Sequence, residues 1–333
     1  MGAYVLIPHL SKDITMGQYI IRRLMAIIPV ILFVSFIVFA LMFIAPGDPI
    51  YLLVDFEQLE GLTAEELDVI RHEKGLDRPV FVQYGDWLWK ALQGDLGNSI
   101  HSNRRVVDMV FTAFPVSLEL ALLSITASLI ISLPVGVYSA LKPDSFGDIV
   151  GSVIAIAGIS APNFWVSFIM IYIFAAKLGW LPPGGFVRIE DNLSENLESL
   201  VLPVFALGIG LMGSVMRMMR SSMLEVMQKD YVRTARAKGA GERILLFRHA
   251  MPNAMLPVLT VIGMQFGALL GGAVVIEQIF RLPGMGRVGI NAIYSRDFPV
   301  LQGVVLIISL SFLLINLVVD LLYGVLDPRI RFS

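Results

Sequence analysis

The side chains best able to bind another molecule are concentrated in one basic segment, residues 231–257, between two long apolar runs. Its guanidinium and ammonium groups could contact anionic lipid or a protein surface. Alanine and long basic side chains favour helix, whereas Gly239 and Gly241 favour a left-handed helix end. The segment therefore predicts a short helix that Gly239 stops, followed by a second helical stretch to Pro252. On charge alone, a juxtamembrane loop that sets topology is the simpler interpretation.

Other chemistry is missing from the sequence. There is no cysteine, which excludes disulfides, zinc–thiolate sites and thiol nucleophiles. There is no GxxxxGK[ST] phosphate cradle, and no nucleophile elbow, paired-acid site or nucleic-acid motif is evident. The four histidines lack metal-ligand spacing: His9, His72, His101 and His249. We therefore expect that this chain binds no metal, cofactor or nucleic acid and is not itself an enzyme.

The composition indicates a membrane protein. Apolar residues make up 56% of the chain, and charged residues only 16%. A bilayer core about 30 Å thick needs about 20 mostly apolar helical residues. Six windows meet this requirement, at about 24–45, 116–140, 149–176, 199–220, 257–279 and 303–325. The sequence thus predicts an all-α integral membrane protein with six transmembrane helices.

Two of these windows have special features. Arg22 and Arg23 precede the first window and no small-residue cleavage site follows it, so we expect an uncleaved anchor helix. Residues 1–15 are polar and irregular and are expected to form a disordered extension. The third window carries Pro162 near its middle, which predicts a kink or break there.

The distribution of Lys and Arg predicts that both termini are cytoplasmic. On that assumption, eight basic residues between Arg217 and Arg248 lie inside, together with those near the two ends of the chain. The short outer segments hold fewer cations, as the positive-inside rule requires. The long segment 46–115 does not enter the count, because long loops translocate regardless of charge.

That long outer segment should be helical. Thr63 to Glu66 form a capping-box pattern that begins a helix expected to end at Gly75. A second helix is expected from Pro79 to about Gln93, with Val80, Phe81, Tyr84, Leu88 and Leu92 on one face. Such an aromatic, amphipathic helix could brace the membrane interface or bind a partner. The chain then divides into residues 16–115, the first span with this segment, and a five-span core at 116–333.

Polar groups within the spans are few. Glu119 and Glu277 lie near the outer ends of the second and fifth windows, where a carboxylate can reach water. Glu277 could instead line a gate or cavity. Asn316, Asp320 and Tyr323 share one face of the last span, and a polar clamp between helices explains them better than a ligand site.

Small residues mark a possible helix seam in the fifth span. Gly263, Gly267 and Gly271 form a GxxxGxxxG ridge, and Gln265 lies on the same helix. Because lipid offers no hydrophobic drive between helices, small residues promote close backbone approach. The ridge could pack within one subunit, face a partner subunit, or form the wall of a pore that Gln265 helps to line. Gly208, Gly210 and Gly213 in the fourth span raise the same alternatives.

The ordered motifs resemble one family, the permease subunits of bacterial ABC importers for dipeptides, oligopeptides and nickel. Thr234 to Gly239 with Leu256-Pro257 is similar to the EAA loop of these permeases. The resemblance covers about residues 17–333 and includes further phrases at 45–49, 94–99, 160–165, 178–182, 283–286 and 326–331. Each phrase is weakly specific alone, whereas their order and spacing together are strong.

The resemblance implies a role for the basic segment. In this family the EAA loop, here about 223–256, docks into the ATPase subunit from the cytoplasm. The coupling residues would be Tyr231, Arg233, Thr234, Ala235, Arg236, Ala237, Lys238, Gly239, Arg248, His249 and Asn253. His249 would be structural there.

The resemblance also implies an assembly. The chain would lie in the bacterial inner membrane beside a homologous permease, two ATP-binding subunits that hold ATP and Mg²⁺, and an extracytoplasmic substrate-binding protein. Peptides are the first choice of cargo, with nickel complexes, glutathione and oligosaccharides as alternatives.

A rival class is the self-sufficient secondary transporter or channel. It would need coupling charges near the bilayer midplane, often with inverted repeats and matching broken helices. Here the ionisable residues lie near the span ends, and only the third window looks broken. A membrane scaffold that recruits partners through residues 46–115 is a third alternative.

Overall fold

The computed structural model describes residues 16–44, 50 and 62–326. Within them the regular elements are all helices: α1 (Met16–Ile44), α3 (Ala64–Lys74), α4 (Val80–Leu92), α5 (Val106–Leu141), α6 (Phe146–Ser160), α7 (Asn163–Met170), η2 (Ile171–Lys177), α8 (Leu193–Met227), α9 (Asp230–Ala237), α10 (Glu242–Ile244), η3 (Leu245–Ala250), α11 (Met251–Ile279), α12 (Met285–Ser295) and α13 (Phe298–Leu326). The expected disorder of residues 1–15, and the motif phrases at 45–49 and 327–331, lie outside the described residues.

The described helices account for the six expected spans. Five are long and apolar enough to cross a bilayer alone, and α6 with α7–η2 makes a sixth as a bent pair. The predicted boundaries were too narrow, since α5 begins at Val106 rather than 116 and α8 at Leu193 rather than 199. A helix of 36 residues is about 54 Å long, well beyond the hydrocarbon core. The windows therefore located the apolar part and missed the ends.

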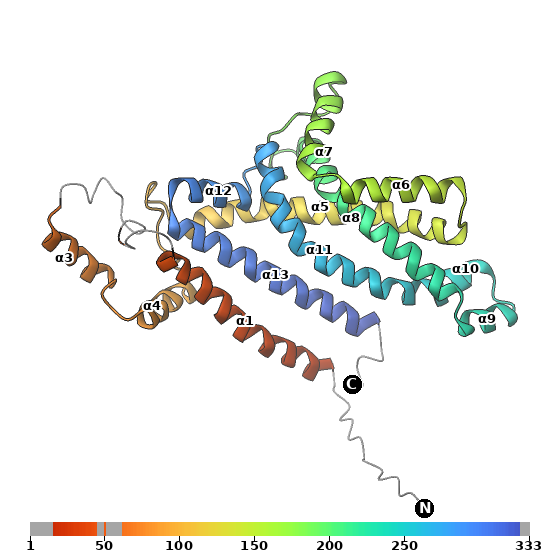
Figure 1. Cartoon of the computed structure of the whole chain (residues 1–333), viewed down its shortest axis with the longest axis horizontal. Helices are drawn as coiled ribbons and strands as arrows, with labels where there is room; N and C mark the ends of the chain where they lie inside the picture. The colour runs from red at the N-terminus through yellow and green to blue at the C-terminus, as the bar shows by residue number, and fades with distance from the viewer. Residues whose placement is uncertain (1–15, 45–49, 51–61, 327–333) are drawn as a thin grey trace, which may run out of the picture.

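The third span is broken where proline predicted a break. Helices α6 and α7 meet at an angle of 110°, with Ala161 and Pro162 between them. Proline cannot supply the N–H that a continuous helix needs, so the chain restarts with Asn163. The second limb, ending in the π-helical turns of η2, projects from the bundle (Figure 1).

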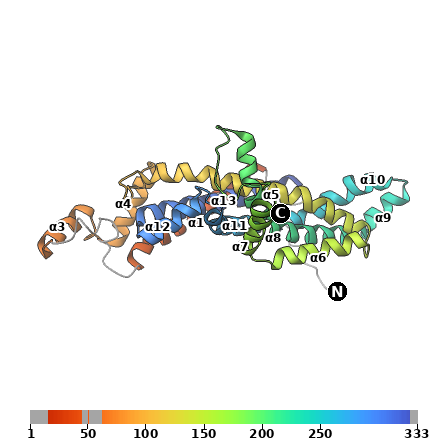
Figure 2. The same cartoon turned by 90° about the horizontal axis from the view of Figure 1, so that it is seen from above.

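Helix α8 is the centre of the core. It packs against α5, α6, α7 and α11 (Figures 1 and 2). Small residues make these contacts close: the Ser128 hydroxyl donates to the Gly208 carbonyl at 3.1 Å, and a methyl group on Gly213 would collide with the Ala155 backbone. Gly208 and Gly213 therefore serve packing within one subunit.

The two ends of the bundle differ. Helices α9 and α10 lie at one end, whereas α12, α3 and α4 lie at the other (Figures 1 and 2). The first residues of α1 and the last of α13 point toward the α9–α10 end (Figure 1). The described ends of α1 and α13 thus lie on the side of the basic segment, as the predicted topology requires.

The described part of the outer segment, from residue 62 onward, contains the two helices that the sequence predicted. Thr63 and Glu66 form the reciprocal capping box of α3, and Gly75 ends that helix at φ +70°. Helix α4 lies against α1, where the Tyr84 hydroxyl is 2.8 Å from the Ser35 hydroxyl and donates to the Leu32 carbonyl at 3.1 Å. Phe81 also lies against α1, where its ring stacks on Phe36 with centroids 5.8 Å apart, although its side chain remains 77% exposed.

Candidate coupling site

Buried side chains attach the basic segment to the bundle. Helix α9 begins three residues after α8 ends, and Val232 is fully buried on its inner face. After the turn, Leu245 and Ala250 are also fully buried, and η3 continues directly into α11. The expected second stretch to Pro252 is therefore the start of a span. Val232, Leu245 and Ala250 belong to one buried cluster with residues of α8 and α11, so α9 is packed against the same core as both spans.

Gly239 ends the first helix in the left-handed conformation that the sequence predicted, at φ +85°. The backbone N–H groups of Gly239 and Ala240 return to the carbonyls of Arg236 and Ala235, which closes the helix end. Across the turn, Arg236 pairs with Glu242, with Nε and Oε1 3.2 Å apart. The turn is thus a defined structure with polar contacts on both sides.

The outward face of the segment is basic with apolar side chains between the cations. Arg233, Arg236, Lys238 and Arg248 are exposed. Tyr231, Ile244 and Phe247 are also exposed, by 44%, 52% and 63%. Thr234 and Asn253 instead bond to the helix backbone, donating to the carbonyls of Asp230 and His249. His249 is half-buried, consistent with a structural role.

Glu277 does not reach water, which corrects one of the two interpretations of its position. It is fully buried, and its carboxylate accepts hydrogen bonds from the Ser117 hydroxyl at 2.6 Å and from the Arg287 N–H at 3.0 Å. Ser117 in turn accepts from the Met285 N–H at 2.8 Å. A methyl group on Gly284 would collide with the same carboxylate. Glu277 therefore fixes the α11–α12 turn against α5, because it satisfies backbone donors at the start of α12.

The glycine ridge packs partly inside the subunit. A methyl group on Gly263 would meet Val319 of α13 at 3.0 Å, and one on Gly267 would meet the Phe312 ring at 2.6 Å. Gly271 is exposed, with no atom of the described residues within 4 Å of an added methyl group. The seam against α13 thus ends before Gly271, and that position is open to a neighbour.

We predict that Gly267→Leu lowers the thermal stability of the detergent-solubilised chain and its level in the membrane. The added side chain must displace Phe312, and overpacking of this kind costs about 1–3 kcal/mol. Gly271→Leu is the matched control, since it adds the same volume on the same helix into open space. Equal stability of the two variants would mean that the α11–α13 seam tolerates bulk. A Gly271→Leu defect seen only in the assembled transporter would place Gly271 at a subunit interface.

Gln265 lies beside an open cleft rather than in the seam. The cleft has a volume of about 1030 Å³ between α6, α8 and α11, and the Gln265 amide donates to the Ser214 hydroxyl at 3.2 Å. Its walls carry both polar and apolar side chains: Ser152, Ile156, Ile159, Ser214, Arg217, Met218, Arg220, Ser221, Val261, Met264 and Gln265. Gln265, which the sequence offered as a pore-lining residue, therefore faces this cleft.

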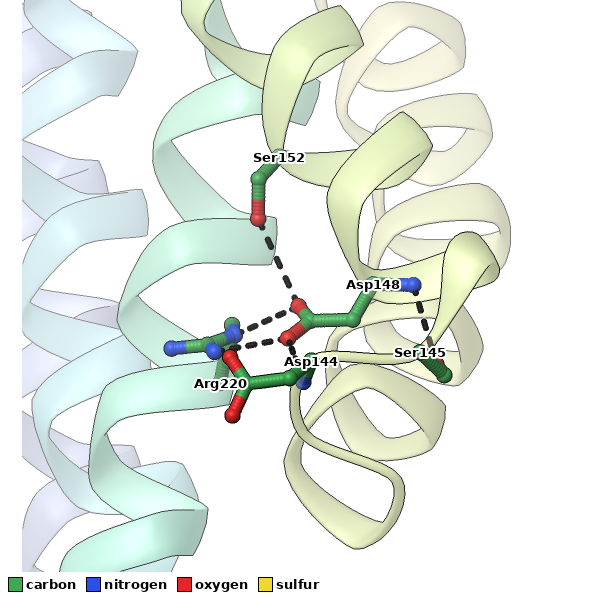
Figure 3. Close-up of polar contacts among 5 residues, drawn as sticks. All are labelled: Asp144, Ser145, Asp148, Ser152 and Arg220. Atoms are coloured by element: carbon green, nitrogen blue, oxygen red, sulfur yellow. Dashed lines mark hydrogen bonds and ion pairs between the residues drawn. The ribbon is translucent and has the colours of Figure 1, made fainter.

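A buried ion pair at the edge of this cleft was not predicted from the sequence. Arg220 of α8 donates two hydrogen bonds to Asp148 of α6, at 2.6 and 2.7 Å (Figure 3). Asp148 also accepts from the Asp144 N–H and the Ser152 hydroxyl (Figure 3). The signal available in the sequence was an acidic residue at the start of one span and an arginine within another, which is costly unless the two charges pair.

Two further sets of polar residues lie within the spans. The side chains of Asp320 and Tyr323 lie outside the described part of the chain, so the clamp with Asn316 stays a prediction. Glu119 is half-buried beside an outer pocket of about 330 Å³ that also contains Arg188 and Glu190. Among the described residues no group of three His, Asp or Glu side chains could hold a metal ion.

Comparison with known proteins identifies the class. Residues 132–332 match the family described as the inner membrane component of binding-protein-dependent transport systems, and residues 16–121 match its N-terminal part. One solved structure, of a methionine ABC transporter in inward-facing conformations, matches with a TM-score of 0.54 at 18% identity, over 66% of this chain and 96% of that one. The chain therefore belongs to the binding-protein-dependent transport permeases and is a multi-pass inner membrane permease subunit of an ABC importer.

Closer relatives cover nearly the whole chain. A Brucella abortus permease named for peptide transport is 42% identical over 96% of this chain and all of its own length. The dipeptide transport permease of Alkalihalophilus pseudofirmus is 37% identical over 95% of this chain, and the glutathione transport permease of Escherichia coli 38% over 96%, each over all of its own length. The three names describe the transport of peptides, dipeptides and glutathione.

Proposed function

We propose that this chain forms half of the translocation pathway of an ATP-driven importer for di- or oligopeptides. The full-length similarity to permeases named for peptide and dipeptide transport supports this cargo, whereas the similarity to a glutathione permease supports the alternative. Within the assembly, a second, homologous permease supplies the other half of the pathway. An extracytoplasmic binding protein delivers the cargo, and two partner subunits bind ATP and Mg²⁺. The five-span core at 116–333 performs transport, whereas residues 16–115 anchor and cover its outer side.

The proposed mechanism assigns α9 and its turn to coupling. The observation that carries this assignment is the form of the segment: an exposed basic and apolar face on a helix whose inner side is anchored by Val232 in the core of α8 and α11. Aromatic and aliphatic anchors with surrounding cations are typical of the centre of protein interfaces. ATP-driven closure of the partner subunits would move α9, and the attached spans would rock between inward-facing and outward-facing arrangements.

Uptake by the reconstituted complex tests the cargo. The chain is co-purified with its partner permease and ATPase subunits, placed in proteoliposomes with ATP inside, and supplied with the binding protein and radiolabelled trialanine outside. We expect uptake that requires both ATP and the binding protein. Competition by unlabelled glutathione, a nickel complex or an oligosaccharide ranks the alternative cargoes. Saturable uptake by the chain alone, without ATP, would contradict the proposal and indicate a secondary transporter or channel.

A further inference from the structure

Among the described residues, the cleft between α6, α8 and α11 contains one cation without a partner. Arg220 is neutralised by Asp148, whereas Arg217, one turn earlier on α8, makes no ion pair or hydrogen bond to any residue that the structure describes. Arg217 lies ten residues before the end of α8, about 15 Å from that end. Its side chain is exposed to the cleft, and a charged residue that faces a cavity between spans commonly marks the path of a substrate.

The other side chains of the cleft suit a peptide. Ser214 and Ser221 flank Arg217 on the same face of α8, and Ser152 and Gln265 face them from α6 and α11. These groups can donate to and accept from backbone amides. The intervening walls include Met218 and Met264, whose flexible thioethers adapt to side chains of different shapes. The volume of about 1030 Å³ is at the upper end of the range for ligand sites, about 300–1,000 Å³.

We propose that this cleft is a transit site in which Arg217 binds the C-terminal carboxylate of the peptide. Every linear peptide has this group whatever its sequence, so one cation can recognise the whole class while the adaptable walls accept varied side chains. A guanidinium fits a carboxylate through two parallel hydrogen bonds. The inference rests on the proposed peptide cargo and adds to it a specificity-determining residue.

Protection of a single cysteine tests the site in the complete transporter. Because the chain has no cysteine, Ser221→Cys places the only thiol of this subunit in the cleft, one turn from Arg217. The complex is held in nanodiscs without ATP, and labelling of this subunit by the neutral reagent N-ethylmaleimide is followed by mass spectrometry. We expect trialanine to slow the labelling about tenfold, and its C-terminal amide to slow it far less, since a hydrogen bond to a charged group is lost.

Arg217 variants connect the effect to the guanidinium. Added to Ser221→Cys, Arg217→Gln should make trialanine and its amide equally weak protectants, and Arg217→Lys should keep part of the preference because it keeps the charge. Equal protection by the acid and the amide in the presence of Arg217 would overturn the inference. An absence of protection in a complex that still imports trialanine would also overturn the inference. In that case the proposed peptide cargo would stand.

Two more results would distinguish a wrong cargo from a bound lipid. If the complex imports no peptide at all, the proposed cargo fails and the transit site fails with it. If labelling slows when phosphatidylglycerol replaces phosphatidylcholine in the nanodiscs, but does not respond to trialanine, Arg217 binds a lipid phosphate and the inference is wrong. Uptake is measured on the same purified complex after its reconstitution into proteoliposomes, so the two failures can be told apart.

Discussion

Gly239→Val is expected to leave the chain in the membrane at a normal level while abolishing both uptake and substrate-stimulated ATP hydrolysis by the complex. Gly239 ends α9 at φ +85°, a region where a β-branched residue is strongly disfavoured. Such strain costs on the order of 1–3 kcal/mol, which reorienting the exposed turn would relieve. The spans are untouched, because an added side chain meets no described atom within 4 Å of Gly239.

Gly241→Val is the matched control for this prediction. Gly241 is two residues away, equally exposed and equally free of neighbours, but its φ of −66° and ψ of 154° suit valine. We expect near-normal uptake from this variant. If both variants transport normally, the turn after α9 has no part in coupling. If both fail, added bulk on the docking surface rather than backbone conformation is responsible.

Local signals in the sequence predicted the local structure well. The capping box at Thr63, the helix end at Gly75, the left-handed turn at Gly239 and the break at Pro162 all formed where they were expected. The left-handed end expected at Gly241 was wrong, because Gly241 begins α10 in an extended conformation at φ −66°. Each depends on backbone conformation within a few residues, which the residue type itself restricts. The apolar windows located the spans for a similar reason, since a bilayer demands a minimum run of apolar residues.

Contacts between distant residues were not predictable in the same way. Asp148 and Arg220 are 72 residues apart, and Glu277 and Ser117 are 160 apart, so nothing local indicates that they meet. One of the two interpretations of Glu277 put its carboxylate in water, because the residue lies close to the end of its window. The structure buries it because α12 folds back and covers that end with its own N-terminus. Burial at a helix end depends on what covers it, which single-sequence periodicity cannot show.

The glycine ridge is a second case in which the sequence predicted close packing but could not identify the partner. Its spacing predicted close packing, and Gly263 and Gly267 do pack closely against α13. The spacing could not say which helix would be the neighbour, nor that the contact would end before Gly271. Gln265, on the same helix, faces the cleft because successive residues of a helix point about 100° apart.

Asp148→Asn is expected to destabilise the chain by about 1.5–3 kcal/mol, because Arg220 loses two hydrogen bonds to a charged partner between α6 and α8. The Arg220 side chain is 29% exposed and lines the cleft, so its remaining charge can reach water and the loss should stay below the range for fully buried pairs. The measurement is thermal unfolding of the detergent-solubilised chain, with its level in the membrane as a second readout. Arg217→Gln, on the same helix without an ion pair, should change stability little.

A double-mutant cycle separates the pair from its surroundings. Arg220→Gln alone should also destabilise, since the buried Asp148 carboxylate then loses both of its strongest hydrogen bonds. Asp148→Asn with Arg220→Gln replaces the charges by two amides that can still bond across the contact, so the double variant should be more stable than either single variant. Additive losses would contradict this, because groups that act as one unit give a coupling energy different from zero. In that case the Asp148 carboxylate would stabilise the α5–α6 turn by accepting from the Asp144 N–H, independently of α8.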